Sequence, residues 1–397
     1  MGLSSSDQRK VDALLRETHA NDGLAPVDLE RFWADRAVAN ADPFGEGIPQ
    51  CAMGDLWSRD CVFSEVGVDY DMTRYTRDAE WRIALNRAYN DRAERIVGRR
   101  LLPETPPDPQ AVQWPQARGL HDIFEARQEW HTGSWWLMQS ASGPGELAAL
   151  LDRVEERLAD LRAFCLPDDW DARKAAAAAA GARPRLYRDQ RGPVTFATSV
   201  YGSEDLVFLI MDRPELARRF SDCILRAMLG LAELLDEEAG YTRETAPRGF
   251  GFRDDNCMLL NLEMYELFGY PILKGIWDRY APDPGDWRYQ HSDSPMAHVL
   301  PALGRLNLTA CNFGPTVSVR QIREHMPHTV IHGVLAPFTL SRNDEAGIAG
   351  EFLRDFGQTR EQRGLQFATA GSVNDGTRLT GARLAMAAIQ RYGRYDD

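Results

Sequence analysis

Trp287-Arg288-Tyr289-Gln290-His291-Ser292-Asp293 has the pattern of a short β-strand that ends in an imidazole and a carboxylate two residues apart. Alternate residues of a strand share one face, so His291 and Asp293 are expected to point to the same side. In an α/β barrel, catalytic side chains gather at the carboxyl ends of the strands. The pair is therefore the first candidate for a functional site, provided that the strand belongs to such a fold.

Strand-like and helix-like segments alternate over the C-terminal two thirds of the chain. This alternation is typical of right-handed βαβ units and a parallel sheet. No G-x-G-x-x-G follows a predicted strand, which argues against a Rossmann domain. We therefore predict a (β/α)8 TIM-type barrel over residues 116–397. The predicted strands are 134–139, 193–199, 249–255, 287–293, 308–313, 329–335 and 365–371.

The first 115 residues have a different texture. Helical patterns cover residues 7–18, 26–38 and 78–100. Residues 102–115 contain five prolines, which exclude a helix interior and indicate a long connection. We predict that residues 1–115 form a mainly helical extension that packs on the barrel.

Composition limits the classes of partner. The chain has 397 residues and a formal net charge of −13, which argues against nucleic acid and an anionic membrane surface and favours a small-molecule substrate. Its six cysteines form no C-x-x-C pair, as expected of a reduced, cytoplasmic protein. The N-terminus has no signal-peptide pattern, and no apolar run approaches the ~18 residues that span a bilayer.

Polar side chains follow most of the predicted strands. Asp254 and Asp255 end the 249–255 strand, where alternation sends them to opposite faces. A carboxylate near the barrel axis has a raised pKa and suits general acid-base work. Each of these groups also has a structural interpretation, since Asp293 can cap the helix that begins near Pro295 and His291 can be a hydrogen-bonded core residue. The predicted catalytic residues are His291, Asp293, Asp254 and Asp255, and the predicted substrate contacts are Tyr201, Asn312, His332, His121 and Asn374.

His291 and Asp293 also form a two-ligand start for a divalent metal. Imidazole nitrogen and carboxylate oxygen suit zinc or iron(II). The third ligand would come from a neighbouring strand, and the sequence does not choose among the candidates. These are Asp254, Asp255, Asn312 and His332.

The C-terminal part of the chain, roughly residues 130–395, resembles the uroporphyrinogen decarboxylase superfamily. That superfamily also includes the zinc-dependent methylcobalamin:coenzyme M methyltransferases. Residues 1–60 lack the arginine-rich motif by which true uroporphyrinogen decarboxylases resemble one another. The methyltransferases have His-x-Cys where this chain has His291 and Asp293, and no cysteine follows the last strand. The resemblance rests on Gly192-Pro193-Val194-Thr195, Asp212-Arg213-Pro214-Glu215, Asp254-Asp255, Phe268-Gly269-Tyr270-Pro271 and Ala370-Gly371-Ser372.

The resemblance implies an α/β-barrel enzyme acting on a small molecule. Its leading interpretation is metal-assisted methyl transfer or demethylation, with a corrinoid protein as methyl carrier and a homodimeric assembly. Two alternatives stay open at this point. One is a metal-free decarboxylase in which Asp254 or Asp255 stabilises a cationic intermediate and arginines hold substrate carboxylates. The other is a non-catalytic module that binds a tetrapyrrole or corrinoid.

Overall fold

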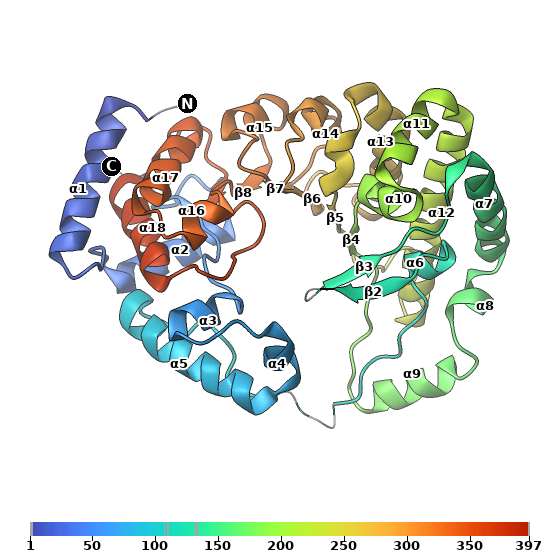
Figure 1. Ribbon diagram of the computed structural model, residues 1–397, viewed down its shortest axis with the longest axis horizontal. Helices are drawn as coiled ribbons and strands as arrows, with labels where there is room; N and C mark the ends of the chain where they lie inside the picture. Colours follow the sequence, from blue (N-terminus) through green and yellow to red (C-terminus); the bar gives the residue numbers. More distant parts are fainter. Residues whose placement is uncertain (1–2, 107, 109–110, 132–133, 396–397) are drawn as a thin grey trace. The chain divides into compact units, whose positions relative to one another are not determined.

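The computed structural model describes residues 3–106, 108, 111–131 and 134–395. The chain divides into two compact units (Figure 1). Residues 108–309 form one unit, and the N-terminal residues up to 107 form the other together with residues 310 onward. Both units combine parallel strands with helices, so the predicted α/β fold is confirmed.

The unit of residues 108–309 contains a set of parallel strands in the order β4-β5-β6 and a separate antiparallel hairpin, β2-β3. Its strands are β2 (Gln128–His131), β3 (Ser134–Leu137), β4 (Asp189–Arg191), β5 (Phe250–Arg253) and β6 (Arg288–Ser292). Its helices are α6 (Leu120–Ile123), α7 (Gly143–Ala159), α8 (Leu161–Cys165), α9 (Trp170–Ala179), α10 (Pro193–Tyr201), α11 (Ser203–Asp212), α12 (Pro214–Glu238), η1 (Asp255–Leu259), α13 (Leu262–Tyr280), η2 (Ala297–Val299) and α14 (Leu300–Gly304).

Strand β5 has one apolar and one polar face. Phe250 and Phe252 of β5 are fully buried, and the ring of Phe252 lies 5.7 Å from that of Trp277 in α13. The Trp277 indole N–H also donates to the Phe250 carbonyl at 2.9 Å, which fixes α13 against the strand. Because side chains alternate along a strand, Arg253 and its register partner His291 lie on the opposite face. This polar face is where chemistry can be placed.

The prediction of a strand over residues 193–199 is wrong. These residues form helix α10, with Pro193 in its first turn, a position that proline favours. Most of the helix is buried, so its apolar residues lack the one-sided pattern of a surface helix. The strand that precedes it, β4, has the polar sequence Asp-Gln-Arg and gives no hydrophobic signal.

Residues 134–139 were predicted to form a buried strand of the barrel, and this too is wrong. β3 pairs with β2 in an antiparallel hairpin, with Trp130 opposite Trp135. Trp135 and Trp136 are 56% and 55% exposed. Tryptophan composition alone does not distinguish a buried strand from an exposed hairpin, because either environment accepts aromatic side chains.

The other unit contains four parallel strands in the order β1-β9-β8-β7. Its strands are β1 (Ala52–Met53), β7 (Ala310–Phe313), β8 (Val330–His332) and β9 (Leu365–Phe367). Its helices are α1 (Ser5–Ala20), α2 (Leu29–Ala41), α3 (Cys61–Val66), α4 (Met72–Arg77), α5 (Ala79–Val97), α15 (Val319–His325), α16 (Pro337–Ser341), α17 (Glu345–Thr359) and α18 (Leu379–Tyr392).

The N-terminal segment is mainly helical, but it also contributes β1, which pairs in parallel with β9. Hydrogen bonds from both ends of the chain strengthen this association. The Glu65 carboxylate accepts the Leu379 N–H at 3.0 Å and so satisfies a backbone donor at the start of α18. The Arg383 guanidinium of α18 donates to the carbonyl of Ala25 at 2.6 Å and also to that of Ile96. The two ends of the sequence therefore fold as one unit.

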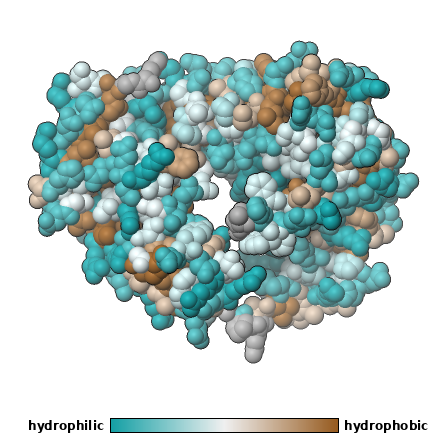
Figure 2. Space-filling model, viewed as in Figure 1, coloured by the Kyte–Doolittle hydropathy of each residue, from teal (hydrophilic) through white to brown (hydrophobic). Residues whose placement is uncertain are grey.

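Hydrophilic side chains cover most of the molecular face shown in Figure 2. Among the described residues, no single helix has the length and apolar character needed to cross a membrane, and the one pair that meets the criteria of length and composition together, α10 with α11, is bent by 101°.

Phe252 tests the apolar side of β5. Phe252→Ala removes a fully buried ring and should lower the free energy of unfolding by about 3–5 kcal/mol. Phe208→Ala is a matched control, because that ring is 52% exposed, and it should change stability by no more than about 0.5 kcal/mol. Urea denaturation followed by circular dichroism compares the two. Equal midpoint shifts would contradict the assigned faces.

Candidate metal centre

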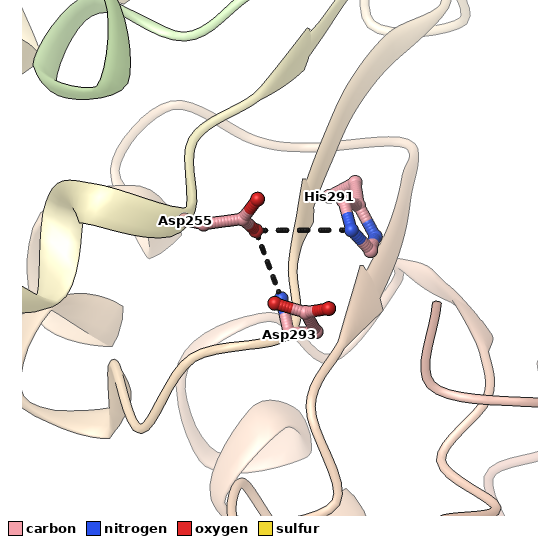
Figure 3. A group of neighbouring side chains, drawn as sticks. All are labelled: Asp255, His291 and Asp293. Carbon is pink, nitrogen blue, oxygen red and sulfur yellow. Dashed lines mark hydrogen bonds and ion pairs between the residues drawn. The ribbon is translucent and has the colours of Figure 1, made fainter. Parts of the chain in front are cut away.

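Three chemistry-bearing side chains meet where β5 and β6 end (Figure 3). β5 ends at Arg253, and the chain then enters the short helix η1, whose first residue is Asp255. His291 is the fourth residue of β6, and Asp293 follows the end of that strand. The two strands are parallel with Arg253 opposite His291, so Asp255 and Asp293 leave the sheet at the same edge.

The geometry of the group suits a metal ion. One ligand atom each from Asp255, His291 and Asp293 lies within 4.8 Å of the others. His291 Nε2 is 3.8 Å from Asp255 Oδ1, and the backbone N–H of Asp293 donates to the same oxygen at 3.1 Å. Metal–ligand bonds of about 2.1 Å place two ligand atoms at most about 4.2 Å apart, so the ligand atoms have to move closer together on binding.

The environment is intermediate between core and surface. The His291 side chain is 15% exposed and that of Asp255 is 44% exposed, while Asp293 is exposed. Burial raises the pKa of Asp255, the negative charge of Asp293 raises it further, and His291 opposes the shift. Two carboxylates this close repel each other when ionised, and a bound cation would remove that repulsion. One imidazole and two carboxylates form a donor set that fits zinc or iron(II) and leaves coordination positions for a substrate.

Asp254 points away from this group. It is fully buried, and its Oδ1 accepts the backbone N–H of Thr195 at 2.8 Å, which caps the first turn of α10. Its own N–H donates to the His291 carbonyl at 2.9 Å and so extends the pairing of β5 with β6. A Cβ on Gly192 would lie 2.6 Å from Asp254 Oδ1, so this close approach requires glycine. Asp254 therefore positions α10 and His291.

The second oxygen of Asp254 has an unusual setting. Oδ2 is buried and has no hydrogen-bond partner among the residues that the structure describes. The same holds for the Tyr265 hydroxyl and the Gln290 amide, which belong to the same unit. Burial raises the pKa of Asp254 to about 7, and the hydrogen bond from Thr195 only partly opposes this shift.

Two of the predicted substrate contacts lie in the unit that carries the metal group. Tyr201 ends α10 and is 1% exposed, with its ring 6.3 Å from that of Phe220, and burial raises its pKa. His121 lies in α6, 3.3 Å from the Asp122 carboxylate, and lines a pocket beside β4. Their contact with a substrate stays a prediction.

The other three belong to the second unit. Asn312 of β7 donates to the carbonyls of His332 and Thr369 at 2.5 and 2.9 Å, so its amide ties neighbouring strands together. The His332 ring contacts the Gln366 amide, and burial lowers its pKa. Asn374 accepts the Thr377 N–H at 3.3 Å through its backbone carbonyl. Their predicted contact with a substrate likewise stays a prediction.

Sequence reasoning left the third ligand open, and the structure brings Asp255 to His291 and Asp293. It did not identify Arg191, the last residue of β4, whose charge interacts with that of Asp255. A polar three-residue strand gave no signal. The Gly192-Pro193 helix start directly after it could have shown that a strand ends there.

The fold and this site define a class: an α/β protein with a candidate divalent-metal centre. No known family model matches the chain, and no curated protein matches its sequence. Among solved structures, it is similar to a methyltransferase from Methanosarcina mazei, at 14% sequence identity and a TM-score of 0.49, over 89% of this chain and 96% of that one. At this level of similarity no reaction can be assigned by comparison, and the function is argued from the site.

Asp254 predicts a pH-dependent stability. Its pKa is raised from 3.8 to about 7 by folding, so ionising it in the folded protein is unfavourable and its contribution to stability falls as pH rises from about 4 to about 7. Asp254→Asn removes that penalty and keeps an oxygen for Thr195. The free energy of unfolding of the variant, relative to that of wild type, should therefore increase by up to about 4 kcal/mol as the pH rises from about 4 to 8.

Chemical denaturation at a series of pH values measures this difference. Asp278→Asn, at a residue whose side chain is 62% exposed, is the control and should follow wild type throughout. Identical pH profiles for Asp254→Asn and wild type would show that Asp254 is not desolvated as described.

Proposed function

We propose that this chain is a metal-assisted enzyme that transfers or removes a methyl group on a small molecule. The observation that carries the proposal is the convergence of Asp255, His291 and Asp293 at one sheet edge. The reaction class comes from the superfamily resemblance. On the same basis we propose a closed (β/α)8 barrel, a corrinoid protein as methyl carrier and a homodimeric assembly.

Asp255, His291 and Asp293 would hold the cation. When bound, a divalent cation supplies a Lewis acid that polarises the reacting group or favours its deprotonation. The side chains present are harder ligands than a thiolate set, so they favour a substrate that binds through oxygen or nitrogen.

The chain's own groups position the reaction. The Asp293 N–H orients the Asp255 carboxylate, and the Asp254 N–H holds the backbone of His291. The proton-transfer role expected for Asp254 or Asp255 is harder to assign to Asp254, because that side chain is fully buried and caps α10. We therefore propose Asp254 as a positioning residue and Asp255, which is partly exposed, as the carboxylate that reaches the substrate.

A metal-free decarboxylase is the second candidate, and Arg191 favours it. This half-buried arginine forms no ion pair within 4.0 Å among the described residues and could hold a substrate carboxylate. In that case, a chelator would leave activity unchanged.

Metal content tests the leading proposal. The purified wild-type protein should bind about one equivalent of zinc or iron, measured by inductively coupled plasma mass spectrometry. Asp255→Asn, His291→Ala and Asp293→Ala each remove one of three protein ligands, so each should lose most of the metal. Adding the metal to chelator-treated protein should raise the melting temperature of wild type but not of the three variants. At a metal concentration of 100 times Kd, the free energy of unfolding of wild type should increase by about 2.7 kcal/mol.

His298→Gln and Asp278→Asn are matched controls, because His298 bonds to the Leu260 carbonyl and Asp278 pairs with Lys274, outside the group. Both should retain the metal. Stoichiometric metal that survives all three ligand substitutions would place the site elsewhere, and a protein that binds none of these metals would leave the decarboxylase as the better candidate.

A further inference from the structure

A pocket of about 420 Å³ lies beside β4 in the unit of residues 108–309. Its volume is within the ~300–1,000 Å³ typical of small-molecule sites. The walls come from residues 114–121, from β4 with the residues before it, and from the C-terminal half of α12. It is distinct from the Asp255, His291 and Asp293 group, none of which lines it.

One side of the pocket is apolar. Leu231 and Leu235 of α12 line it together with Leu186 and Phe196. Leu231 and Phe196 are almost fully buried and belong to the core, so this wall is rigid. It can accept a flat or branched hydrocarbon group, whose burial stabilises a complex by about 25 cal/mol per Å².

The remaining lining combines three arginines with neutral side chains, among them three glutamines. Arg118, Arg185 and Arg191 line the pocket, and no aspartate or glutamate does so among the residues that the structure describes. None of the three arginines has a carboxylate within 4.0 Å in that part of the chain. His121 lies beside Asp122, whose carboxylate also accepts the Gly119 N–H. In a chain with a net charge of −13, this is a local site of positive charge.

Arg191 is the most constrained of the three. It is half-buried, and its Nη1 donates to the Ser199 hydroxyl at 3.1 Å. Burial lowers its pKa, and the charge of Asp255 partly opposes that shift. A guanidinium that is partly removed from water without a bonded carboxylate is unfavourable, and a bound anion would offset this cost.

Tyr187 belongs to the same lining. It is 8% exposed, and its hydroxyl is buried with no hydrogen-bond partner among the described residues. Its ring lies 6.0 Å from that of Phe250, which holds the side chain in place. Because the hydroxyl has no surface accessible from the pocket, Tyr187 contributes other atoms of its side chain or backbone to the lining.

We propose that this pocket binds an organic anion, with its carboxylate, sulfonate or phosphate group at Arg191 and Arg185 and its apolar body against α12. Arg191 is in register with Arg253 and, through it, with His291. Two strand spacings separate Arg191 from His291, about 10 Å along the sheet. Binding in the pocket depends on the arginines and the apolar wall, and not on a metal.

Isothermal titration calorimetry on the full-length protein without added metal tests this proposal. The probes are 2-naphthoate, its neutral amide 2-naphthamide and inorganic phosphate. We expect 2-naphthoate to bind at one site at least about tenfold more tightly than either of the others, because only it has both the charge and the apolar body. Arg191→Met and Arg185→Met should each weaken 2-naphthoate about tenfold and leave 2-naphthamide unchanged.

Two further variants separate the pocket from general charge and from misfolding. Arg226→Met removes the same charge from a 49% exposed side chain of α12 that does not line the pocket, and it should bind 2-naphthoate like wild type. Leu235→Trp keeps every arginine and fills the space, so it should abolish binding of both naphthyl probes while retaining the wild-type circular dichroism spectrum.

Equal affinity for the acid and the amide, or an Arg226→Met effect as large as that of Arg191→Met, would overturn the proposal. So would phosphate binding as tightly as 2-naphthoate, or no detectable binding of 2-naphthoate. Because metal content is measured separately, loss of the metal centre and loss of the anion pocket are distinguishable results.

Discussion

The parallel pairing of β5 with β6 is the constraint on which the candidate site depends. With Arg253 opposite His291, both strands end at the same edge, and the first residues beyond them are brought together. The Asp254 N–H continues the pairing to the His291 carbonyl. Backbone hydrogen bonds thus set the separation of Asp255 from His291, and the side chains make only the final adjustment. A site built on strand ends in this way is more rigid than one built on long loops.

The two adjacent aspartates that follow β5 have opposite roles. Asp254 turns inward and caps α10 through the Thr195 N–H, while Asp255 turns toward the polar face. Gly192 is part of the same arrangement, since a side chain there would collide with Asp254. The start of α10, the end of β5 and the backbone of His291 are therefore coupled, so a change at any of them is expected to disturb the geometry of the candidate metal centre.

The unit of residues 108–309 also separates charges of opposite sign. Carboxylates dominate the edge at β5 and β6, whereas arginines line the pocket beside β4. Arg191 belongs to the pocket, and its charge also interacts with that of Asp255 at the edge. A centre that attracts a cation and a pocket that attracts an anion can thus occur within one small α/β unit, without neutralising each other through a direct salt bridge.

Sequence patterns by themselves were enough to predict an α/β protein with parallel strands, and to predict the strand that carries His291. Local hydrophobic periodicity carries that information. Tertiary structure decided that residues 193–199 are helical, because the carboxylate of Asp254, distant in sequence, caps that helix. It also decided that β4 is a strand, because β5 pairs with it. It also selected Asp255 over Asp254 as the partner of His291 and Asp293, since the direction of each carboxylate depends on strand register and on the helix start at Gly192. These are long-range contacts, which a local pattern does not encode.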